Sequence, residues 1–250
     1  MIRSGNEDNF TVDAGESRGV FIVADGMGGH AAGEVASEMA VQIVQRELAP
    51  LRDLDGDDVV QVVAAALKKA NRAIHDRTLT EVDKQGMGTT ASVLLVSGPR
   101  YVIGQIGDSR VYLLRDGQLR QLTKDHSYVQ EQVDAGFLTP EQARYHPYSN
   151  VITRCVGASQ DVEPDIYRGE VRAGDLFLVA SDGLTGMVDD RRLAQLLSSR
   201  AEPERKVQSL ISEANGRGGL DNITAIIVQV LETGPASSDP NLTREVTPVG

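Results

Sequence analysis

The sequence predicts a layered α+β fold, in which two long helices cover sheets built from short apolar strands. Apolar side chains recur every three or four positions over residues 31–48 and again over 59–74, which is helical spacing. Short apolar runs at 21–24 and 176–180 are bounded by turn residues, a pattern typical of strands buried on both faces. Long helices followed by a series of strands favour helices layered on sheets.

The remaining elements follow from the same patterns in chain order. Strands are expected at 9–12, at 91–96, within 101–123, at 175–180 and at 223–231. Further helices are expected at 127–135, from 140 onward, at 191–198 and at 203–214. Asp57 or Asp58 is a candidate N-cap for the second long helix, and Thr139 for the helix that begins at Pro140. Asp116-Gly117 is interpreted as a tight hairpin turn.

Two segments differ from this regular pattern. Residues 234–250 are rich in small residues and proline and show no periodicity, so we expect a disordered tail after a globular domain over 1–233. Residues 128–157 are mostly irregular and hold three of the six tyrosines. A long irregular insertion on a rigid scaffold often binds substrate, although plain connecting structure explains it equally well.

Composition excludes several classes of partner. The net charge of −11 argues against binding to nucleic acid or to anionic membranes. No apolar stretch is long enough to span a membrane, and the first residues do not form a signal-peptide core, so we expect a cytoplasmic protein without membrane insertion. The single cysteine, Cys155, allows no internal disulfide. We expect the chain to act as a monomer.

Four aspartates lie where apolar runs meet glycine-rich turns. They are Asp25, Asp108, Asp182 and Asp221, in the segments FIVADGMGGH, VIGQIGDS, LFLVASDG and GGLDNITAIIVQV. One such aspartate alone is more simply the start of a turn. Four at distant points indicate instead that strand ends converge on a cluster of carboxylates, which requires a cation because like charges so close cannot all stay ionised. The pattern therefore predicts a magnesium or manganese site.

Other phosphate chemistries fit less well. A cysteine phosphatase needs an arginine six residues after its nucleophile, and that position after Cys155 is Asp161. Cys155 is therefore interpreted as a small buried residue. The sequence contains no GxxxxGK[ST] loop, no GxGxxG match at the glycines around Asp25, and no HxxxH pair for zinc.

Taken together, the motifs resemble a known family. The series RSGNED, VADGMGGH, MGTT, IGDSRVY, LTKDHS, SDGL and GGLDNIT, from Arg3 to about Val230, is similar to the ordered motifs of bacterial PP2C-type metal-dependent serine/threonine protein phosphatases. The resemblance implies a four-layer α-β-β-α sandwich of two antiparallel sheets, with a metal cleft at one end. It also implies hydrolysis of phosphoserine and phosphothreonine in proteins, opposing a serine/threonine kinase.

The resemblance also implies the ligands of two Mn²⁺ or Mg²⁺ ions. Asp25 would bridge the two ions, and Asp182 and Asp221 would complete the first. The carbonyl of Gly26 and, through water, Glu7 would serve the second. A metal-activated water would then be the nucleophile, so that no protein nucleophile is needed.

Further roles come from the same comparison of motifs. Asp108 resembles the ligand of a weaker third metal, shared with Asp182. Arg3 matches the arginine that holds the substrate phosphate, for which its forked guanidinium is suited. Asp8 and Asn222 are expected to orient the metal ligands.

The resemblance leaves the source of the leaving-group proton open. Many eukaryotic relatives have histidine directly after the Asp-Gly pair, where this sequence has Met27. Either a metal-bound water or His30 would donate the proton, and we favour a packing or capping role for His30 at the helix start. Segment 128–157 resembles the bacterial flap beside the cleft, where Tyr145 and Tyr148 would contact large substrates. The family has a further strand segment before Arg3, so the first strand is expected to be shortened.

Two alternatives to a phosphoprotein phosphatase remain. One is another two-metal phosphohydrolase, acting on small phosphomonoesters or nucleic acid, and the acidic charge weakens the nucleic-acid version. The other is a catalytically silent phosphoprotein-binding module, which has no need for Asp25, Asp182 and Asp221. Phosphate release from a phosphothreonine peptide with manganese would separate these hypotheses.

Overall fold

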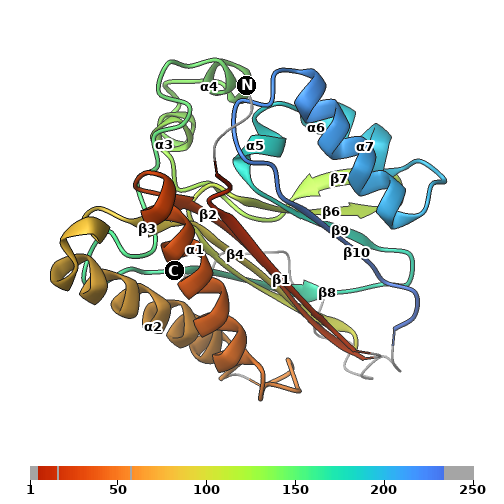
Figure 1. The fold of residues 1–250 in the computed structure, drawn as a ribbon. Helices are drawn as coiled ribbons and strands as arrows, with labels where there is room; N and C mark the ends of the chain where they lie inside the picture. Colours follow the sequence, from red (N-terminus) through yellow and green to blue (C-terminus); the bar gives the residue numbers. More distant parts are fainter. Residues whose placement is uncertain (1–4, 16, 57, 234–250) are drawn as a thin grey trace.

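A computed structural model describes residues 5–15, 17–56 and 58–233, without the side chains of His30 and Ala31. Its described part forms two antiparallel sheets packed face to face, with helices on both outer faces (Figure 1). The first sheet consists of β1 (Asp8–Ala14), β2 (Arg18–Met27), β4 (Ala91–Ser97), β5 (Arg100–Ile106) and β8 (Asp165–Glu170) in that order, with β3 (Gly88–Thr89) paired to β2. The second has the order β10 (Ala225–Gln229), β9 (Leu176–Ala180), β6 (Arg110–Arg115) and β7 (Gln118–Gln121). The four-layer α-β-β-α prediction is confirmed.

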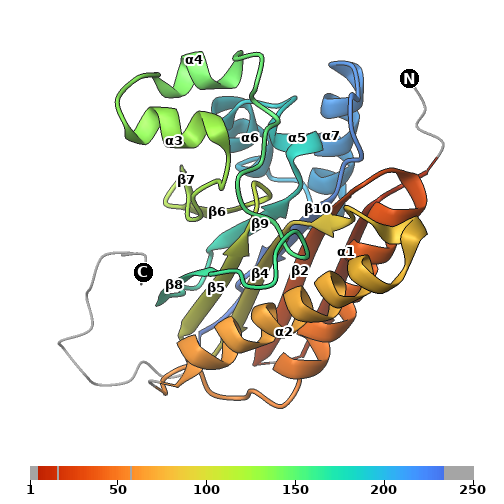
Figure 2. The same ribbon diagram turned by 90° about the vertical axis from the view of Figure 1, so that its left-hand side faces the viewer.

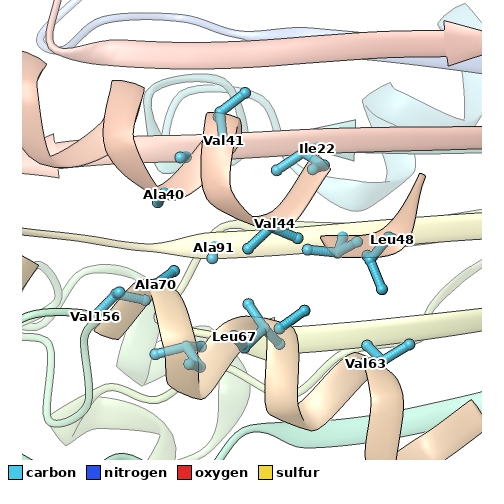
Figure 3. Packing of buried hydrophobic residues seen from close by; sticks show 14 of the residues in the cluster. Ile22, Ala40, Val41, Val44, Leu48, Val63, Leu67, Ala70, Ala91 and Val156 are labelled. Atoms are coloured by element: carbon cyan, nitrogen blue, oxygen red, sulfur yellow. The ribbon is translucent and has the colours of Figure 1, made fainter. Parts of the chain in front are cut away.

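Two long helices cover the outer face of the first sheet. They are α1 (His30–Leu48) and α2 (Val59–Thr80), which lie side by side in Figure 2. Alternation along β2 sends Ile22 toward these helices and Phe21 toward the second sheet. Figure 3 shows Ile22 packed near Val44 of α1. The run 21–24 is therefore apolar throughout because both faces of β2 are buried.

Two short helices cover the outer face of the second sheet. They are α6 (Asp190–Leu197) and α7 (Pro203–Gly216), and they bury Leu193 and Leu210 against Leu178 of β9. A single turn of helix, α5 (Asp182–Thr185), follows β9 directly. Figures 1 and 2 place α3 (Tyr128–Asp134) and α4 (Pro140–Arg144) beyond the end of the sandwich at which α5 lies.

Most predicted elements are confirmed, and the differences have local causes. Thr139 forms a capping box at the start of α4, and Asp116-Gly117 makes the β6–β7 turn with positive φ at both residues. Asp58 occupies the N-cap position of α2, but its side chain makes no capping hydrogen bond to the described residues of the helix. Strand β8 went unpredicted because its sequence, DIYRGE, lacks an apolar run.

Three smaller expectations also have outcomes. Strand β10 ends two residues earlier than the predicted 223–231 segment and begins two residues later. Cys155 is half-buried rather than buried, and burial raises the pKa of its thiol. No helix in the described ranges is long and apolar enough to cross a membrane. The predicted tail at 234–250 lies outside the described residues.

Candidate metal centre

Asp25 is held at the end of β2 by its own backbone. Its N–H donates to Thr90 Oγ1 at 2.9 Å, and its carbonyl accepts from Thr89 Oγ1 and from the Thr90 N–H, each at 2.9 Å. Register places Asp25 directly opposite Asp8 of β1. The backbone hydrogen bonds of Asp25 are therefore satisfied, and its carboxylate lies on the strand position next to Asp8.

Asp8 joins the two sheets. Its side chain is buried, and Oδ2 accepts hydrogen bonds from Ser181 Oγ at 2.9 Å and from Thr224 Oγ1 at 2.7 Å. Ser181 directly follows β9 and Thr224 directly precedes β10, so one carboxylate oxygen of the first sheet ties two strands of the second. The other oxygen, Oδ1, is buried and has no hydrogen-bond partner among the described residues.

Asp182 and Asp221 are brought together by a glycine. A β-carbon on Gly183 would lie 1.9 Å from the carbonyl oxygen of Asn222, so the turn after β9 and the turn before β10 touch through their backbones. The Asn222 N–H donates to Asp221 Oδ1 at 2.7 Å. Asp182 begins α5 and Asp221 lies directly before Asn222, so their side chains start from adjacent backbone segments.

Glu7 and Gly26 lie against the first turns of α1. The Gly26 N–H donates to the Glu7 carbonyl at 3.1 Å, and that carbonyl also accepts from Ser37 Oγ at 2.6 Å. The Glu7 N–H donates to Asn222 Oδ1 at 3.0 Å. Gly33 allows this approach, because a β-carbon there would lie 2.0 Å from Glu7 Oε2. The predicted ligands of both ions thus share one backbone network.

Burial and mutual repulsion raise the pKa values of the clustered carboxyls. The pKa of Asp25 lies well above its usual range, first through burial and then through the charges of Asp8, Asp182 and Asp108. Burial followed by the Asp182 charge raises the pKa of Asp108 in the same way, and burial raises those of Asp8 and Asp182. The raised pKa values mean that these carboxyls lose their protons less readily than exposed ones, and the Arg110 charge only partly opposes the rise at Asp108 and Asp182.

The donor set fits a hard divalent cation. Among the described residues, three buried side-chain oxygens have no hydrogen-bond partner, and they are Oδ1 of Asp8, Asp108 and Asp182. Oxygen ligands of this kind suit Mg²⁺ and Mn²⁺. No three His, Cys, Asp or Glu side chains in the described ranges are already grouped as a metal site.

Asp108 follows a tight turn at the end of β5. Gly107 has φ 100°, and a β-carbon there would lie 2.6 Å from the Thr90 side chain. Asp108 is buried, and the Arg110 charge opposes the rise in its pKa. The turn and Thr90, which also bonds Asp25, place the predicted third-metal ligand beside the main cluster.

The predicted flap carries exposed aromatic side chains. Tyr145 is 79% exposed and Tyr148 is 58% exposed. The Tyr148 ring packs edge-on against Tyr128, with centroids 5.9 Å apart, and against His146. Arg144 Nη2 donates to the Gly186 carbonyl at 3.1 Å, which ties the end of α4 to the loop after α5. Both tyrosines thus present exposed rings at the surface.

Two predicted residues fall outside the described part, and several supporting residues went unpredicted. Arg3 lies in the undescribed first residues, and for His30 the structure places only the backbone, as the first residue of α1. The unpredicted residues position the acidic cluster and comprise Gly33, Ser37, Thr90, Ser181 and Thr224. Thr90, Ser181 and Thr224 lie within the motifs MGTT, SDGL and GGLDNIT, so these motifs could have identified them as residues near the metal ligands. Gly33 and Ser37 lie outside the motifs.

Comparison with known proteins agrees with this geometry. The family model for protein phosphatase 2C matches residues 3–215. Serine/threonine protein phosphatase PstP of Mycobacterium tuberculosis is 41% identical over 248 residues, which are 99% of this chain and 46% of that protein. Serine/threonine phosphatase stp of Listeria monocytogenes is 38% identical over 232 residues, 91% of each chain.

Solved structures agree as well. The catalytic domain of PstP in complex with two manganese ions matches with a TM-score of 0.80 and 40% identity, over 93% of this chain and 94% of that chain. The chain thus spans about half the length of the mycobacterial relative but nearly all of its catalytic domain. The motif series, the four-layer fold and the family match agree, and the chain belongs to the protein phosphatase 2C family.

Proposed function

We propose that this chain hydrolyses phosphoserine and phosphothreonine in proteins, in a reaction that depends on Mn²⁺ or Mg²⁺. The observation that carries the proposal is the set of buried carboxylate oxygens of Asp8, Asp108 and Asp182 that have no hydrogen-bond partner among the described residues, between converging strand ends. Family membership supports the reaction class, and the curated relatives named above are serine/threonine phosphatases.

Five residues would hold the two core ions. Asp25 would bridge them, Asp182 and Asp221 would bind the first, and the Gly26 carbonyl with Glu7 through water would serve the second. The manganese pair in the PstP catalytic domain supports manganese as the first ion to test. Two bound cations would activate a water molecule as the nucleophile and stabilise the phosphoryl oxygens during in-line displacement.

The chain's other residues would orient and bind. Asp8, held by Ser181 and Thr224, keeps the strand ends of both sheets in register, so that Asp25 and Asp182 stay adjacent. Asn222 supports Glu7 through its amide oxygen. Arg3 would hold the substrate phosphate through its forked guanidinium.

Asp108, His30 and the two flap tyrosines would complete the site. Asp108, with Asp182, would bind a third ion less tightly than the bridged pair, because it offers fewer protein ligands. His30 would cap or pack at the start of α1 rather than donate the leaving-group proton. Tyr145 and Tyr148 would contact phosphoproteins through the flap over about 128–157.

The remaining proposals concern the setting. We propose a catalytic domain over 1–233, and the tail expected at 234–250 lies outside the described residues. Its substrates would be the targets of a bacterial serine/threonine kinase, and the net charge of −11 argues against contacts with nucleic acid. A cytoplasmic monomer remains the expectation from composition.

The test is phosphate release from a phosphothreonine peptide, with manganese and with a chelator. We expect turnover with manganese, loss in chelator, and recovery when manganese returns. Asp182→Asn should abolish turnover, whereas the control Asp161→Asn, whose side chain is 82% exposed, should not change it. Efficient turnover of an aryl phosphate without any turnover of phosphopeptides would favour a small-molecule phosphohydrolase instead.

A further inference from the structure

His126 is a buried histidine that no step of the proposed reaction uses. It is 6% exposed and follows β7, directly before the segment that carries α3 and α4. Its hydrogen bonds reach the turn before Asp108, the far end of the flap segment and strand β8. A polar ring buried at the junction of three segments can set the geometry of all of them.

Two of these hydrogen bonds join His126 to Gly107, the residue before Asp108. The Gly107 N–H donates to His126 Nδ1 at 3.0 Å, and the Gly107 carbonyl accepts from the His126 N–H at 2.9 Å. Both polar groups of this glycine therefore bond to His126, and its carbonyl also accepts from Gln105 Nε2 at 3.0 Å. Gly107 has no side chain through which the turn could be held, and His126 is the residue that holds its N–H.

The tautomer of the ring follows from these bonds. Because Nδ1 accepts from a backbone N–H, the ring proton lies on Nε2, which faces Asp165 Oδ2 at 3.2 Å. Arg154 Nη1 also lies 3.0 Å from Nε2, but both atoms are donors, and Arg154 donates to Asp165 Oδ1 at 2.7 Å. The hydrogen bond from His126 is the largest of the causes that lower the pKa of Asp165 to about 2.

The residue before His126 holds the other side of the Asp108 turn. Asp125 is buried and accepts from Arg110 Nε at 2.9 Å and from Arg110 Nη2 at 2.6 Å. Arg110 is two residues after Asp108, and Gly107 is one residue before it. Asp125 and His126 thus form hydrogen bonds to the residues on both sides of Asp108. Asp108 Oδ1 itself has no partner among the described residues.

The same residue also closes the base of the flap segment. The His126 carbonyl accepts from the Thr153 N–H at 2.9 Å, and Ser127 pairs with Ile152 in an antiparallel bridge. The two ends of the segment therefore meet at His126. A displacement of the flap base would therefore reach Gly107 through the backbone and ring of His126.

We propose that His126 is a positioning residue that holds Asp108 toward the third-metal position and couples that position to the base of the flap. The inference rests on the proposed metal-dependent phosphatase function. Residues that orient a ligand in this way typically contribute about 10–100-fold in metal affinity or activity. His126 would act through Gly107 and would touch neither metal nor substrate.

Manganese calorimetry on three variants tests the role of Nδ1. His126→Asn keeps an acceptor near the Nδ1 position, whereas His126→Gln places its amide near the Nε2 position and leaves the Gly107 N–H without an acceptor. The control His75→Gln removes another ring contact to a glycine backbone, His75 Nδ1 to the Gly157 carbonyl at 3.2 Å, away from Asp108. Thermal melts in chelator report folding of each variant.

We expect His126→Gln to weaken the weakest manganese site by about 10–100-fold while the two tighter sites keep their affinity. His126→Asn should recover most of that affinity, and His75→Gln should match the wild type. If His126→Gln fails to fold, His126→Leu takes its place, because its apolar side chain also leaves the Gly107 N–H without an acceptor, and the weakest site should again lose affinity.

Several results would overturn the inference. They are wild-type affinity at the weakest site in His126→Gln, equal losses in His126→Gln and His126→Asn, an unchanged weakest site in His126→Leu, or only two manganese sites in the wild type. Failure of the proposed function is distinct, because the wild type would then bind no manganese and release no phosphate.

Discussion

Gly183→Ala should separate two proposed metal ligands without altering any carboxylate. The added β-carbon would lie 1.9 Å from the Asn222 carbonyl oxygen, about 1.5 Å short of the 3.4 Å at which ordinary contact begins. The obstacle is backbone, so the turn bearing Asp182 must move away from the turn bearing Asp221. Coordination distances tolerate only roughly 0.2 Å, so a shift of this size disrupts a shared ion.

The expected cost to the metal-free protein is smaller than the cost to binding. Overpacking of this kind destabilises by about 1–3 kcal/mol, and each kcal/mol lowers the melting temperature by roughly 2–4 °C in a chain of this size. The matched control is Gly216→Ala, at the end of α7, where an added β-carbon meets nothing within 4 Å. That substitution should leave stability unchanged or raise it by up to about 1 kcal/mol.

The assay combines melting in chelator, manganese calorimetry and phosphopeptide turnover. Gly183→Ala should melt moderately lower, bind manganese weakly and lose turnover by orders of magnitude, while Gly216→Ala stays at wild type in the last two. Wild-type manganese affinity and turnover in Gly183→Ala would refute the reasoning, because the close backbone contact would then not set the spacing of Asp182 and Asp221.

Three further predictions concern the carboxylates and the flap. Asp108→Ala should keep two manganese ions by calorimetry yet hydrolyse phosphopeptides poorly, and unchanged stoichiometry at high manganese would contradict this. In chelator, melting temperature should fall as pH rises above the ordinary aspartate pKa of 3.8, because the pKa values of Asp25, Asp108 and Asp182 are raised and the folded state holds more protons than the unfolded state. Manganese should remove that fall, since it binds the deprotonated carboxylates, and a rise in chelator would argue against the buried cluster. Substitution of Tyr145 and Tyr148 should lower phosphoprotein turnover more than aryl phosphate turnover, and equal losses would indicate a scaffold role.

Local patterns in the sequence were enough to predict the long helices, the helix cap at Thr139 and the turn at Asp116-Gly117. Helical spacing over 31–48 and 59–74 matched α1 and α2, because each buries one continuous face on the first sheet. Thr139 and the Asp116-Gly117 turn were readable because capping and turn chemistry depend on neighbouring residues alone. Strand β8 escaped prediction because its pairing with β5, not an apolar run, makes it a strand.

The motif series identified the family and pointed to Asp25, Asp182 and Asp221, but only the tertiary structure decided how the aspartates meet. Asp8 reaches Ser181 and Thr224 across 173 and 216 residues of chain, which is a result of how the two sheets pack. Their raised pKa values likewise arise from desolvation and from neighbours far away in the chain. No local pattern encodes such shifts, because burial and the distance between charges exist only after the chain has folded.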